Sequence, residues 1–345
     1  MPAPILPCPP DTPDPAVIER AGRTLRDGGL VAIPTETVYG LAANALDDAA
    51  VAAIFTAKRR PASDPLIVHV DGPEMAARVV DGPLSAPAAV LAAAFWPGPL
   101  TLVLPRNEAV PPAVSSGLAT VGVRCPSHPV ASAIITAADV PVAAPSANRF
   151  GRISPTRADH VAAELGDRID LIVDGGPCDA GVESTVVSFD GDTAVVLRHG
   201  AIPLESIAEH VTVRAVDTAA DEALASPGHD ERHYSPGTPT VAVVAGFDPA
   251  DARPGDVVYL GYEGDEPTLP TGWRFVGLGS RSDLAAVAHG LYDALHRTDA
   301  DGPMRIIVEL TGVAGLGRAI DDRLTRAGSS RVATSVGDLE DVERA

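Results

Sequence analysis

The chain has 345 residues, of which 46% are hydrophobic and only 4% aromatic, and its formal net charge is −20 at pH 7. This length suggests two domains, the apolar content excludes a disordered chain, and a core of Val, Ile, Leu and Ala suits α/β layers. The negative charge repels nucleic acid at long range, so any anion site must be a local basic pocket.

Cysteine usage and the N-terminus bear on location. Cys8, Cys125 and Cys178 are widely spaced and form neither a metal signature nor a disulfide framework, which is typical of a reducing cytoplasm. The proline-rich N-terminus lacks the cationic start and long apolar run of a signal peptide. No stretch approaches the roughly 18 apolar residues that a membrane span needs. We therefore expect a cytoplasmic protein that does not enter a membrane.

Strand and helix patterns alternate along the first two-thirds of the chain. Several strand candidates are continuous apolar runs, as expected for strands covered on both faces. Strands are predicted at 30–34, 65–70, 99–105, 120–126, 140–146, 170–176, 184–190 and 194–200. Helices are predicted at 15–27, 47–58, 73–81, 85–95, 129–138 and 157–165.

The pattern changes near residue 211, where prolines and glycines replace apolar residues and a linker is predicted. A second α/β pattern follows this linker. Its strands are predicted at 240–245, 256–260, 273–277 and 304–309, and its helices at 281–297 and 316–327. We predict a large domain over 12–210, a linker or lid over 211–238, and a small domain over 239–335.

The stretch “AKRRPASDPLIVHV” places three cations directly before a proline and an apolar strand. A helix end favours cations through its dipole, so an isolated cation here needs no functional explanation. Pro61, however, restricts Arg60 to an extended conformation, which leaves Lys58 and Arg60 two residues apart at the helix end. Such a pair suits phosphate oxygens. His69 lies in the following strand and, taken alone, is more typical of a satisfied strand histidine.

Polar side chains follow the ends of two predicted strands, where open α/β sheets place ligands. Thr35, Glu36 and Thr37 follow the first strand, although a Thr-rich turn that caps a helix is the simpler interpretation of that segment alone. Ser146 and Asn148 follow another strand in “APSANRFGRISPT”. A serine there also suits a nucleophile, but the G-x-S-x-G pattern is absent, so a binding role is favoured.

Two arginines lie near the ends of further strands, Arg124 in “TVGVRCPSHP” and Arg198 in “VLRHGAI”. For either one alone, the charge of an edge strand is an equally good interpretation. Together with Lys58 and Arg60 they would give one rim of the sheet four cations among hydroxyl groups. The sequence shows no metal-ligand cluster.

Nearly the whole chain resembles the longer, two-domain threonylcarbamoyl-AMP synthases. The shared motifs are “PTETVYGL”, the K-x-R-P of “KRRP” before “PLIVHV”, “FWPGPLTLVL”, “VRCPSHP”, “APSAN” with “FGRISPT”, “ESTVV”, “LRHGAI” and the linker “SPGHDERHYSP”. The second domain resembles the family's C-terminal domain through “LYDALHRTDADG”, “RIIVE” and “GLGRAIDDRL”. Each motif alone is weakly specific, but eight in the right order are a strong signal.

The resemblance implies an open twisted mixed sheet with a concave basic cleft over 12–210, a YrdC-like catalytic domain, and a small Rossmann-like C-terminal domain. It implies a nucleotidyltransferase that converts L-threonine, bicarbonate or CO₂, and ATP to threonylcarbamoyl-AMP and pyrophosphate. This is the first step toward threonylcarbamoyladenosine beside the tRNA anticodon. ATP is then a substrate, Mg²⁺ accompanies it, and a tRNA threonylcarbamoyl transferase receives the product. Stable nucleic-acid binding is not expected.

Carried over motif by motif, the resemblance implies the site residues. Lys58 and Arg60 are the catalytic cations. The threonine set is Thr35, Thr37, His69, Arg124, Ala144 and Ser184. The ATP set is Lys58, Arg60, Asp64, Thr120, Ser146, Asn148, Ser154, Arg198 and Tyr234. In this set Tyr234 would reach from the linker over the nucleotide. No resident metal site is implied.

The sequence departs from the family pattern at four places. Asp64 replaces the usual Asn, and an acid beside a triphosphate is unfavourable unless it faces Mg²⁺. Phe150-Gly151 replaces Ser-Gly, and His229–Glu231 replaces a Met-Lys-Tyr segment, which lowers the positive charge of the lid. “ELTGVAG” replaces a proline-rich segment in the second domain.

Two other functions stay open at this point. One is an RNA-binding module of the same fold without adenylate synthesis, against which the acidic composition argues. The other is a carbamoyl transferase with a different substrate, but relatives of that kind carry zinc and acylphosphatase modules that are not found in this sequence.

Overall fold

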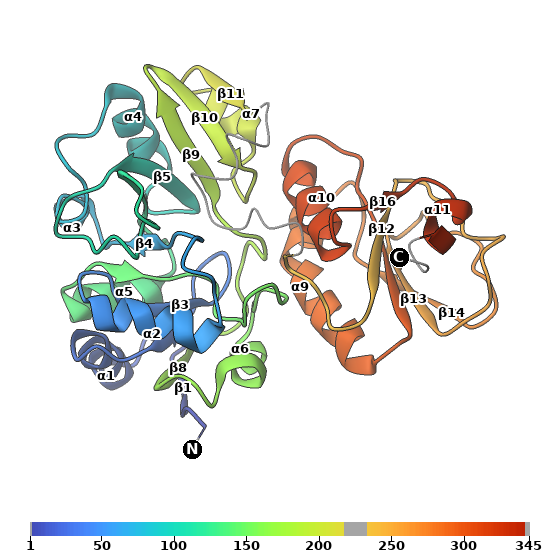
Figure 1. Cartoon of the computed structure of the whole chain (residues 1–345), viewed down its shortest axis with the longest axis horizontal. Helices are drawn as coiled ribbons and strands as arrows, with labels where there is room; N and C mark the ends of the chain where they lie inside the picture. The colour runs from blue at the N-terminus through green and yellow to red at the C-terminus, as the bar shows by residue number, and fades with distance from the viewer. Residues whose placement is uncertain (1, 217–232, 342–345) are drawn as a thin grey trace. The chain divides into compact units, whose positions relative to one another are not determined.

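The computed structural model describes residues 2–216 and 233–341, which form two compact units (Figure 1). The N-terminal unit comprises 2–150 and 154–216, and the C-terminal unit comprises 151–153 and 233–341. Most of the predicted linker, including the altered segment His229–Glu231, lies outside the described residues. The predicted domain limits stay a prediction.

The N-terminal unit is built on an 11-stranded sheet with the order β1-β8-β2-β3-β7-β4-β6-β5-β9-β10-β11. Its strands are β1 (Ile5–Pro7), β2 (Val31–Ile33), β3 (Gly40–Asn44), β4 (Ile67–His69), β5 (Leu100–Pro105), β6 (Thr120–Arg124), β7 (Val142–Ala143), β8 (Leu171–Asp174), β9 (Thr185–Asp190), β10 (Thr193–Arg198) and β11 (Val213–Ala215). Parallel and antiparallel pairs alternate irregularly, so the sheet is mixed, as predicted.

The unit has seven described helices, of which the first two begin at a side-chain cap. They are α1 (Pro15–Arg26), α2 (Asp48–Lys58), α3 (Pro73–Ala76), α4 (Ala86–Phe95), α5 (Pro129–Ala138), α6 (Ala158–Leu165) and α7 (Leu204–Ala208). The Asp14 carboxylate accepts a hydrogen bond from Ala16 N at 2.8 Å, and Asp47 accepts one from Ala49 N at 2.8 Å. Helices α1 and α5 pack closely, because a Cβ on Gly22 would come within 2.9 Å of the backbone at Ala137.

Two local predictions were wrong. The segment after Thr37 does not enter a helix but forms β3, which pairs with β2 and β7. The small apolar residues of β3 are buried between two strands. A short run of buried apolar residues has no periodicity that distinguishes a strand from a helix. The helix predicted at 73–81 ends at Ala76, after which the chain turns and Val80 forms a bridge to Arg106.

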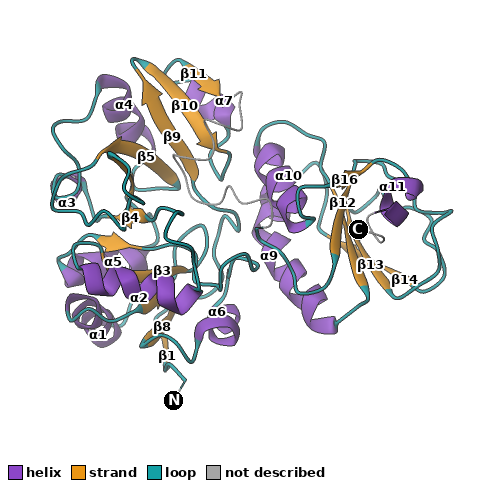
Figure 2. Ribbon diagram, viewed as in Figure 1, coloured by secondary structure: helices purple, strands orange, loops and turns teal. Residues whose placement is uncertain are grey.

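The C-terminal unit has a five-stranded parallel sheet with the order β14-β13-β15-β12-β16, a Rossmann-like arrangement as predicted. Its strands are β12 (Thr240–Val243), β13 (Val257–Gly261), β14 (Trp273–Gly277), β15 (Arg305–Glu309) and β16 (Val332–Ala333). Its helices are α9 (Leu284–Asp301), α10 (Leu316–Ala327) and α11 (Val336–Asp341). Helices α9 and α10 pack on each other, and α10 packs on β12 (Figure 2).

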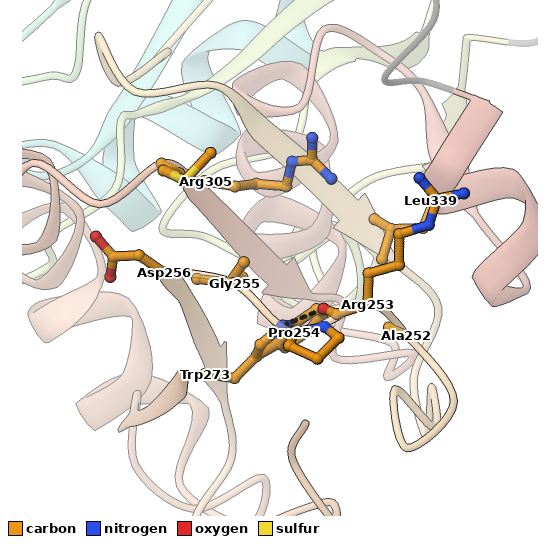
Figure 3. Close-up of a pocket in the computed structure, with 10 residues that line it drawn as sticks. Ala252, Arg253, Pro254, Gly255, Asp256, Trp273, Arg305 and Leu339 are labelled. Carbon is orange, nitrogen blue, oxygen red and sulfur yellow. Dashed lines mark hydrogen bonds between the residues drawn. The ribbon is translucent and has the colours of Figure 1, made fainter. Parts of the chain in front are cut away.

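A cavity of about 220 Å³ lies in the C-terminal unit at the amino ends of β13, β14 and β15 (Figure 3). Its lining includes Arg253, Trp273 and Arg305, and the Trp273 indole donates a hydrogen bond to Arg253 O at 3.0 Å. Open parallel sheets bind ligands beyond the carboxyl ends of their strands, so this cavity lies at the opposite edge.

Membrane spans and disulfides can be judged for the described residues. None of the helices in these two stretches of chain is both long and apolar enough to cross a membrane. Cys8, Cys125 and Cys178 are buried and free, as expected from their spacing.

Candidate active site

Strand register brings three polar side chains into one row on the large sheet. His69 on β4 is paired with Arg124 on β6, and Arg124 is paired in turn with Thr101 on β5. Residues that are directly opposite on neighbouring strands present their side chains on the same face. The histidine, the arginine and the threonine therefore lie side by side at one end of these strands.

Small and apolar residues continue the same face along the strands. Two positions back from the polar row, Gly122 lies between Ile67 and Val103. A Cβ on Gly122 would lie 3.2 Å from Thr101 Cγ2 and 3.4 Å from Ile67 Cγ1. The absence of a side chain at this position therefore leaves space above the strand. These residues and Thr120 line a recess. From Arg124 to Thr120 the recess face extends about 13 Å, at a rise of about 3.3 Å per residue.

The turn between β2 and β3 supplies a second wall around Arg124. Arg124 Nη2 lies 2.8 Å from Glu36 Oε1, and Nη1 donates a hydrogen bond to Thr37 Oγ1 at 2.9 Å. The Thr37 hydroxyl lies 2.9 Å from that of Thr35, which donates to Val38 O at 2.7 Å. These residues are all buried. The structure thus brings together Thr35, Thr37, His69 and Arg124 of the predicted threonine set.

Burial and charge set the protonation of this group. Burial, reinforced by the positive charge of Arg124, lowers the pKa of His69 to about 3, so the imidazole is neutral at pH 7. Burial alone would raise the pKa of Glu36, but the positive charge and close contact of Arg124, with the nearby backbone at Glu36 and Ser127, outweigh it and hold that pKa below its usual value. Glu36 and Arg124 are therefore a buried ion pair near neutral pH.

Several buried polar atoms of this group have no well-formed hydrogen bond within the part of the chain that the structure describes. They are both carboxylate oxygens of Glu36, Nε and Nη2 of Arg124, and Nδ1 of His69. The close contact of Glu36 with Arg124 is thus an ion pair without hydrogen-bond alignment. Because buried polar groups are nearly always satisfied, such a concentration of exceptions points to a missing ligand with both donors and acceptors.

Ser184 and Ala144 complete the predicted threonine set. The Ser184 hydroxyl lies 2.8 Å from that of Thr101, and Arg198 Nη2 donates to Ser184 Oγ at 3.1 Å and to Ser184 O at 3.0 Å. Arg198 is therefore joined to the polar row through Ser184. Ala144 N donates to Ile67 O at 3.0 Å, which places this backbone beside β4.

Lys58 connects the end of α2 to the loop that carries Ser146 and Asn148. Its ammonium donates to Ser146 O at 2.6 Å and to Asn148 O at 2.5 Å, while Phe150 N donates to Lys58 O at 2.9 Å. Burial and then the charge of Arg60 lower the pKa of Lys58 well below its ordinary value. An ammonium has three N–H donors, so one remains beyond the two backbone contacts.

Arg60 is paired with Asp64 inside the segment that follows α2. Arg60 Nη2 lies 2.8 Å from Asp64 Oδ2 and donates to Pro65 O at 2.8 Å, and Arg60 Nε donates to Asp64 O at 3.1 Å. Both side chains are buried. The acid that replaces the usual Asn therefore offsets the charge of a predicted phosphate-binding cation.

The remaining predicted ATP residues lie in different surroundings. The Ser154 hydroxyl donates to Glu183 Oε1 at 2.7 Å, and both side chains are buried. Tyr234 belongs to the C-terminal unit, where it packs against His233, Tyr292 and Arg323 with a backbone φ of 58°. Its contact with a nucleotide stays a prediction.

Sequence reasoning missed two residues of this site. Thr101 was assigned only to a strand, although it is the single hydroxyl in the run “LTLVLP” and shares a register row with Arg124. Glu36 was noted in its turn but given no role. An acid within “PTETVYGL” becomes informative only when its buried partner, Arg124, is known.

Comparisons with known proteins agree with the fold. Residues 23–200 match the family model described as “Telomere recombination”, and residues 202–329 match the model described as “Threonylcarbamoyl-AMP synthase, C-terminal domain”. These matches define the class of the protein, a two-domain nucleotidyltransferase.

The relatives narrow this class further. The chain is 39% identical to the threonylcarbamoyl-AMP synthase of Pyrococcus abyssi, covering 91% of this chain and 95% of that one, and 41% identical to that of Bacillus subtilis, covering 93% and 95%. A crystal structure of P. abyssi Sua5 complexed with L-threonine superimposes with a TM-score of 0.82 at 35% identity, covering 96% of this chain and 99% of that one. The chain belongs to the threonylcarbamoyl-AMP synthase family.

Proposed function

We propose that this protein joins L-threonine, bicarbonate or CO₂, and ATP to give threonylcarbamoyl-AMP and pyrophosphate. The threonine amine captures CO₂ as a carbamate, and a carbamate oxygen then attacks the α-phosphorus of ATP while pyrophosphate leaves. Chemistry of this kind needs positioning and charge stabilisation more than a protein nucleophile.

The observation that carries this proposal is the set of buried, unsatisfied polar atoms around Arg124. A free amino acid has the carboxylate oxygens that Arg124 Nε and Nη2 lack and the amine hydrogens that Glu36 lacks. Arg124 would bind the threonine carboxylate. The threonine hydroxyl would meet the hydroxyls of Thr35 and Thr37, and His69, Ser184 and the backbone at Ala144 would enclose the substrate. The relative from P. abyssi that is complexed with L-threonine supports threonine as the ligand.

ATP would lie along the recess toward Thr120, with its phosphates near the loop that Lys58 fixes. The remaining N–H of Lys58 would donate to a phosphate oxygen, and Arg60 would add charge after a partial release from Asp64. The phosphate and sugar region would be contacted by Ser146, Asn148, Ser154 and Arg198.

Tyr234 would close over the nucleotide, so Tyr234→Ala should weaken ATP retention. Unchanged ATP affinity in this variant would show that Tyr234 does not bind the nucleotide.

Mg²⁺ would enter with the ATP phosphates. Over residues 2–216 and 233–341, no three His, Cys, Asp or Glu side chains gather into a metal-binding group. The ligands of that ion would be mainly phosphate oxygens and water. When bound, the ion would neutralise charge on the transferring phosphate.

The product would pass to a tRNA threonylcarbamoyl transferase, because a mixed anhydride of a carbamate and a phosphate is an activated acyl donor. The free, buried cysteines support a reducing, cytoplasmic location. An RNA-binding module without synthesis is not favoured, since the net charge of −20 opposes nucleic-acid binding.

Incubation of the purified protein with L-threonine, bicarbonate, ATP and Mg²⁺ tests this function. Mass spectrometry should detect threonylcarbamoyl-AMP, and pyrophosphate release should stop when threonine is omitted. Pyrophosphate release that does not depend on threonine, or no acyl-adenylate at any substrate concentration, would refute the proposal.

A further inference from the structure

The Glu36–Arg124 pair makes the amino-acid pocket electrically neutral before the substrate arrives. The carboxylate and the guanidinium lie 2.8 Å apart, and both side chains are buried. Arg124 also has a hydroxyl neighbour, Thr37. Neither carboxylate oxygen of Glu36 accepts a well-formed hydrogen bond within the described residues, although the backbone at Glu36 and Ser127 helps to lower its pKa. The pocket therefore presents one negative and one positive group, each with unused hydrogen-bonding capacity.

The charge of a guest decides whether such a pocket can accept it. A carboxylate without an amine would place two negative groups on one arginine and leave one buried negative charge, which is costly away from water. A zwitterionic amino acid carries both signs and keeps the total at zero. The neutral pair thus selects for the α-amino group as well as the carboxylate.

We propose that Glu36 binds the α-amino group of the substrate and takes a proton from it before the amine adds to CO₂. This inference rests on the proposed function and names a further residue of its active site. Arg124 holds the substrate carboxylate from one side, while Glu36 orients the amine from the other.

The proposed proton transfer balances. The ammonium gives one proton to the Glu36 carboxylate, which becomes a carboxylic acid, and the amine lone pair is freed. The nitrogen then forms a bond to the carbon of CO₂ while one C=O electron pair moves to oxygen. The second proton leaves the nitrogen for water, which gives the carbamate anion.

Substrate binding itself would make Glu36 a better proton acceptor. In the free protein, burial raises the pKa of Glu36 and Arg124 lowers it, and the arginine prevails. When the substrate carboxylate shares Arg124, the arginine contributes less to the pKa of Glu36, while the ammonium beside Glu36 favours the carboxylate form. Once the ammonium has given up its proton, burial raises the pKa of Glu36 and stabilises the proton there.

The histidines and thiols near Glu36 carry no charge at pH 7. Burial lowers the pKa of His128 at the start of α5, as it lowers that of His69 on β4. Burial raises the thiol pKa of Cys125, after β6, to about 11, and it also raises that of Cys178 in the loop after β8. Two further acids act on this set, Asp71 on Cys125 and Asp179 on His128 and Cys178. A pH effect on the amine is assigned to Glu36 because its carboxylate contacts Arg124.

The decisive variant is Glu36→Gln, which removes the charge and keeps the shape. At pH 7 the KM for threonine should rise at least tenfold. Activity should partly recover as the pH approaches the pKa of the amine, since a free amine needs no proton acceptor. Binding of 3-hydroxybutanoate, which lacks the amine, should become tighter than in the wild type, because its single charge now matches a pocket of charge +1. ATP affinity without threonine should not change.

Two further variants separate this role from a loss of structure. Glu309→Gln removes the buried carboxylate of another Glu–Arg pair and should leave the threonine KM and the pH profile unchanged. Glu36→Asp keeps the charge and should retain the wild-type shape of the pH profile at a lower rate, which preserves the test if Glu36→Gln does not fold.

A Glu36→Gln protein with wild-type KM and pH profile would overturn the inference. So would a uniform loss at every pH with threonine and 3-hydroxybutanoate weakened alike, since that result indicates a structural role. Failure of the proposed function is a different result, in which the wild-type protein itself makes no threonylcarbamoyl-AMP.

Discussion

Each unit buries a glutamate against an arginine, and the two pairs differ in how completely their polar atoms are satisfied. In the C-terminal unit, Glu309 Oε1 lies 2.5 Å from Arg281 Nη2 and accepts a hydrogen bond from Gly246 N at 2.7 Å. Arg281 also pairs with Asp265 at 2.8 Å and lies over the Tyr262 ring, 4.0 Å from its centroid. In the N-terminal unit, the Glu36–Arg124 pair leaves donors and acceptors unused.

This difference distinguishes an ion pair that stabilises the fold from one that belongs to a ligand-binding site. A satisfied buried network rigidifies the surrounding fold. A buried polar group without a partner costs about 1–3 kcal/mol, so a cluster of them persists where a ligand supplies the missing bonds. Both glutamates are buried and both pairs are charged, so the satisfaction of the polar atoms is the more informative difference between the two sites.

The largest effect should come from Arg124→Gln. Removing one member of a buried, hydrogen-bonded charge pair costs roughly 2–5 kcal/mol, so threonine should bind about 30- to 5,000-fold more weakly in calorimetric titration. Arg281→Gln should instead destabilise the C-terminal unit by about 3–5 kcal/mol and leave threonine affinity unchanged while the protein is folded. Equal effects of the two variants on threonine binding would contradict the conclusion that Arg124 binds the substrate and Arg281 is structural.

Lys58→Met should come next. The substitution keeps the apolar stem and removes the donor proposed for a phosphate oxygen, so kcat should fall about 100-fold, the usual effect of losing one stabilising donor. Arg59→Gln is the matched control, because Arg59 is the neighbouring cation but is exposed at the end of α2. A similar fall in both variants would indicate a general charge effect.

Gly122→Val should have a moderate effect. The added side chain would meet Thr101 and Ile67 on the recess floor, and overpacking of this kind costs about 1–3 kcal/mol. We expect kcat/KM for ATP to fall roughly tenfold. Gly72→Val is the control, because nothing lies within 4 Å of a Cβ added at Gly72. It should leave kcat/KM for ATP nearly unchanged. Normal ATP kinetics in a folded Gly122→Val protein would show that ATP does not bind along the recess.

The smallest effect is expected for Asp64→Asn. It removes the charge that offsets Arg60 but keeps the side-chain shape, so the guanidinium can turn its charge to phosphate. The KM for ATP should fall about two- to fivefold at low salt, with less change at high salt, as for an electrostatic effect of this size. A higher KM for ATP would mean that Asp64 itself serves the nucleotide, for example through Mg²⁺.

The sequence predicted most of the fold because its elements have strong local signals. Asp47 marks the start of α2, and the continuous apolar runs around Ile67 and Leu102 mark buried strands. Strand β3 was missed because “GLAAN” has neither the alternation of a strand nor the length of a helix, and only its neighbours on both sides define it.

The site was less predictable than the fold, because its chemistry depends on pairs that are distant in sequence. Glu36 meets Arg124 across 88 positions, and Lys58 reaches carbonyls that lie as far away. Motif resemblance supplied the residue names but not these contacts. The i, i+4 pair of Arg60 with Asp64 is the exception, since its spacing was visible in the sequence and its meaning was not recognised.

The double attachment of Lys58 has a consequence for the motion of the predicted phosphate loop. The Lys58 ammonium donates hydrogen bonds to the backbone carbonyls of Ser146 and Asn148, and the Lys58 backbone carbonyl accepts one from Phe150 N. The loop therefore cannot swing outward without fraying the last turn of α2. Amide protons in that turn should exchange with solvent in step with those of the loop, and nucleotide should slow both together.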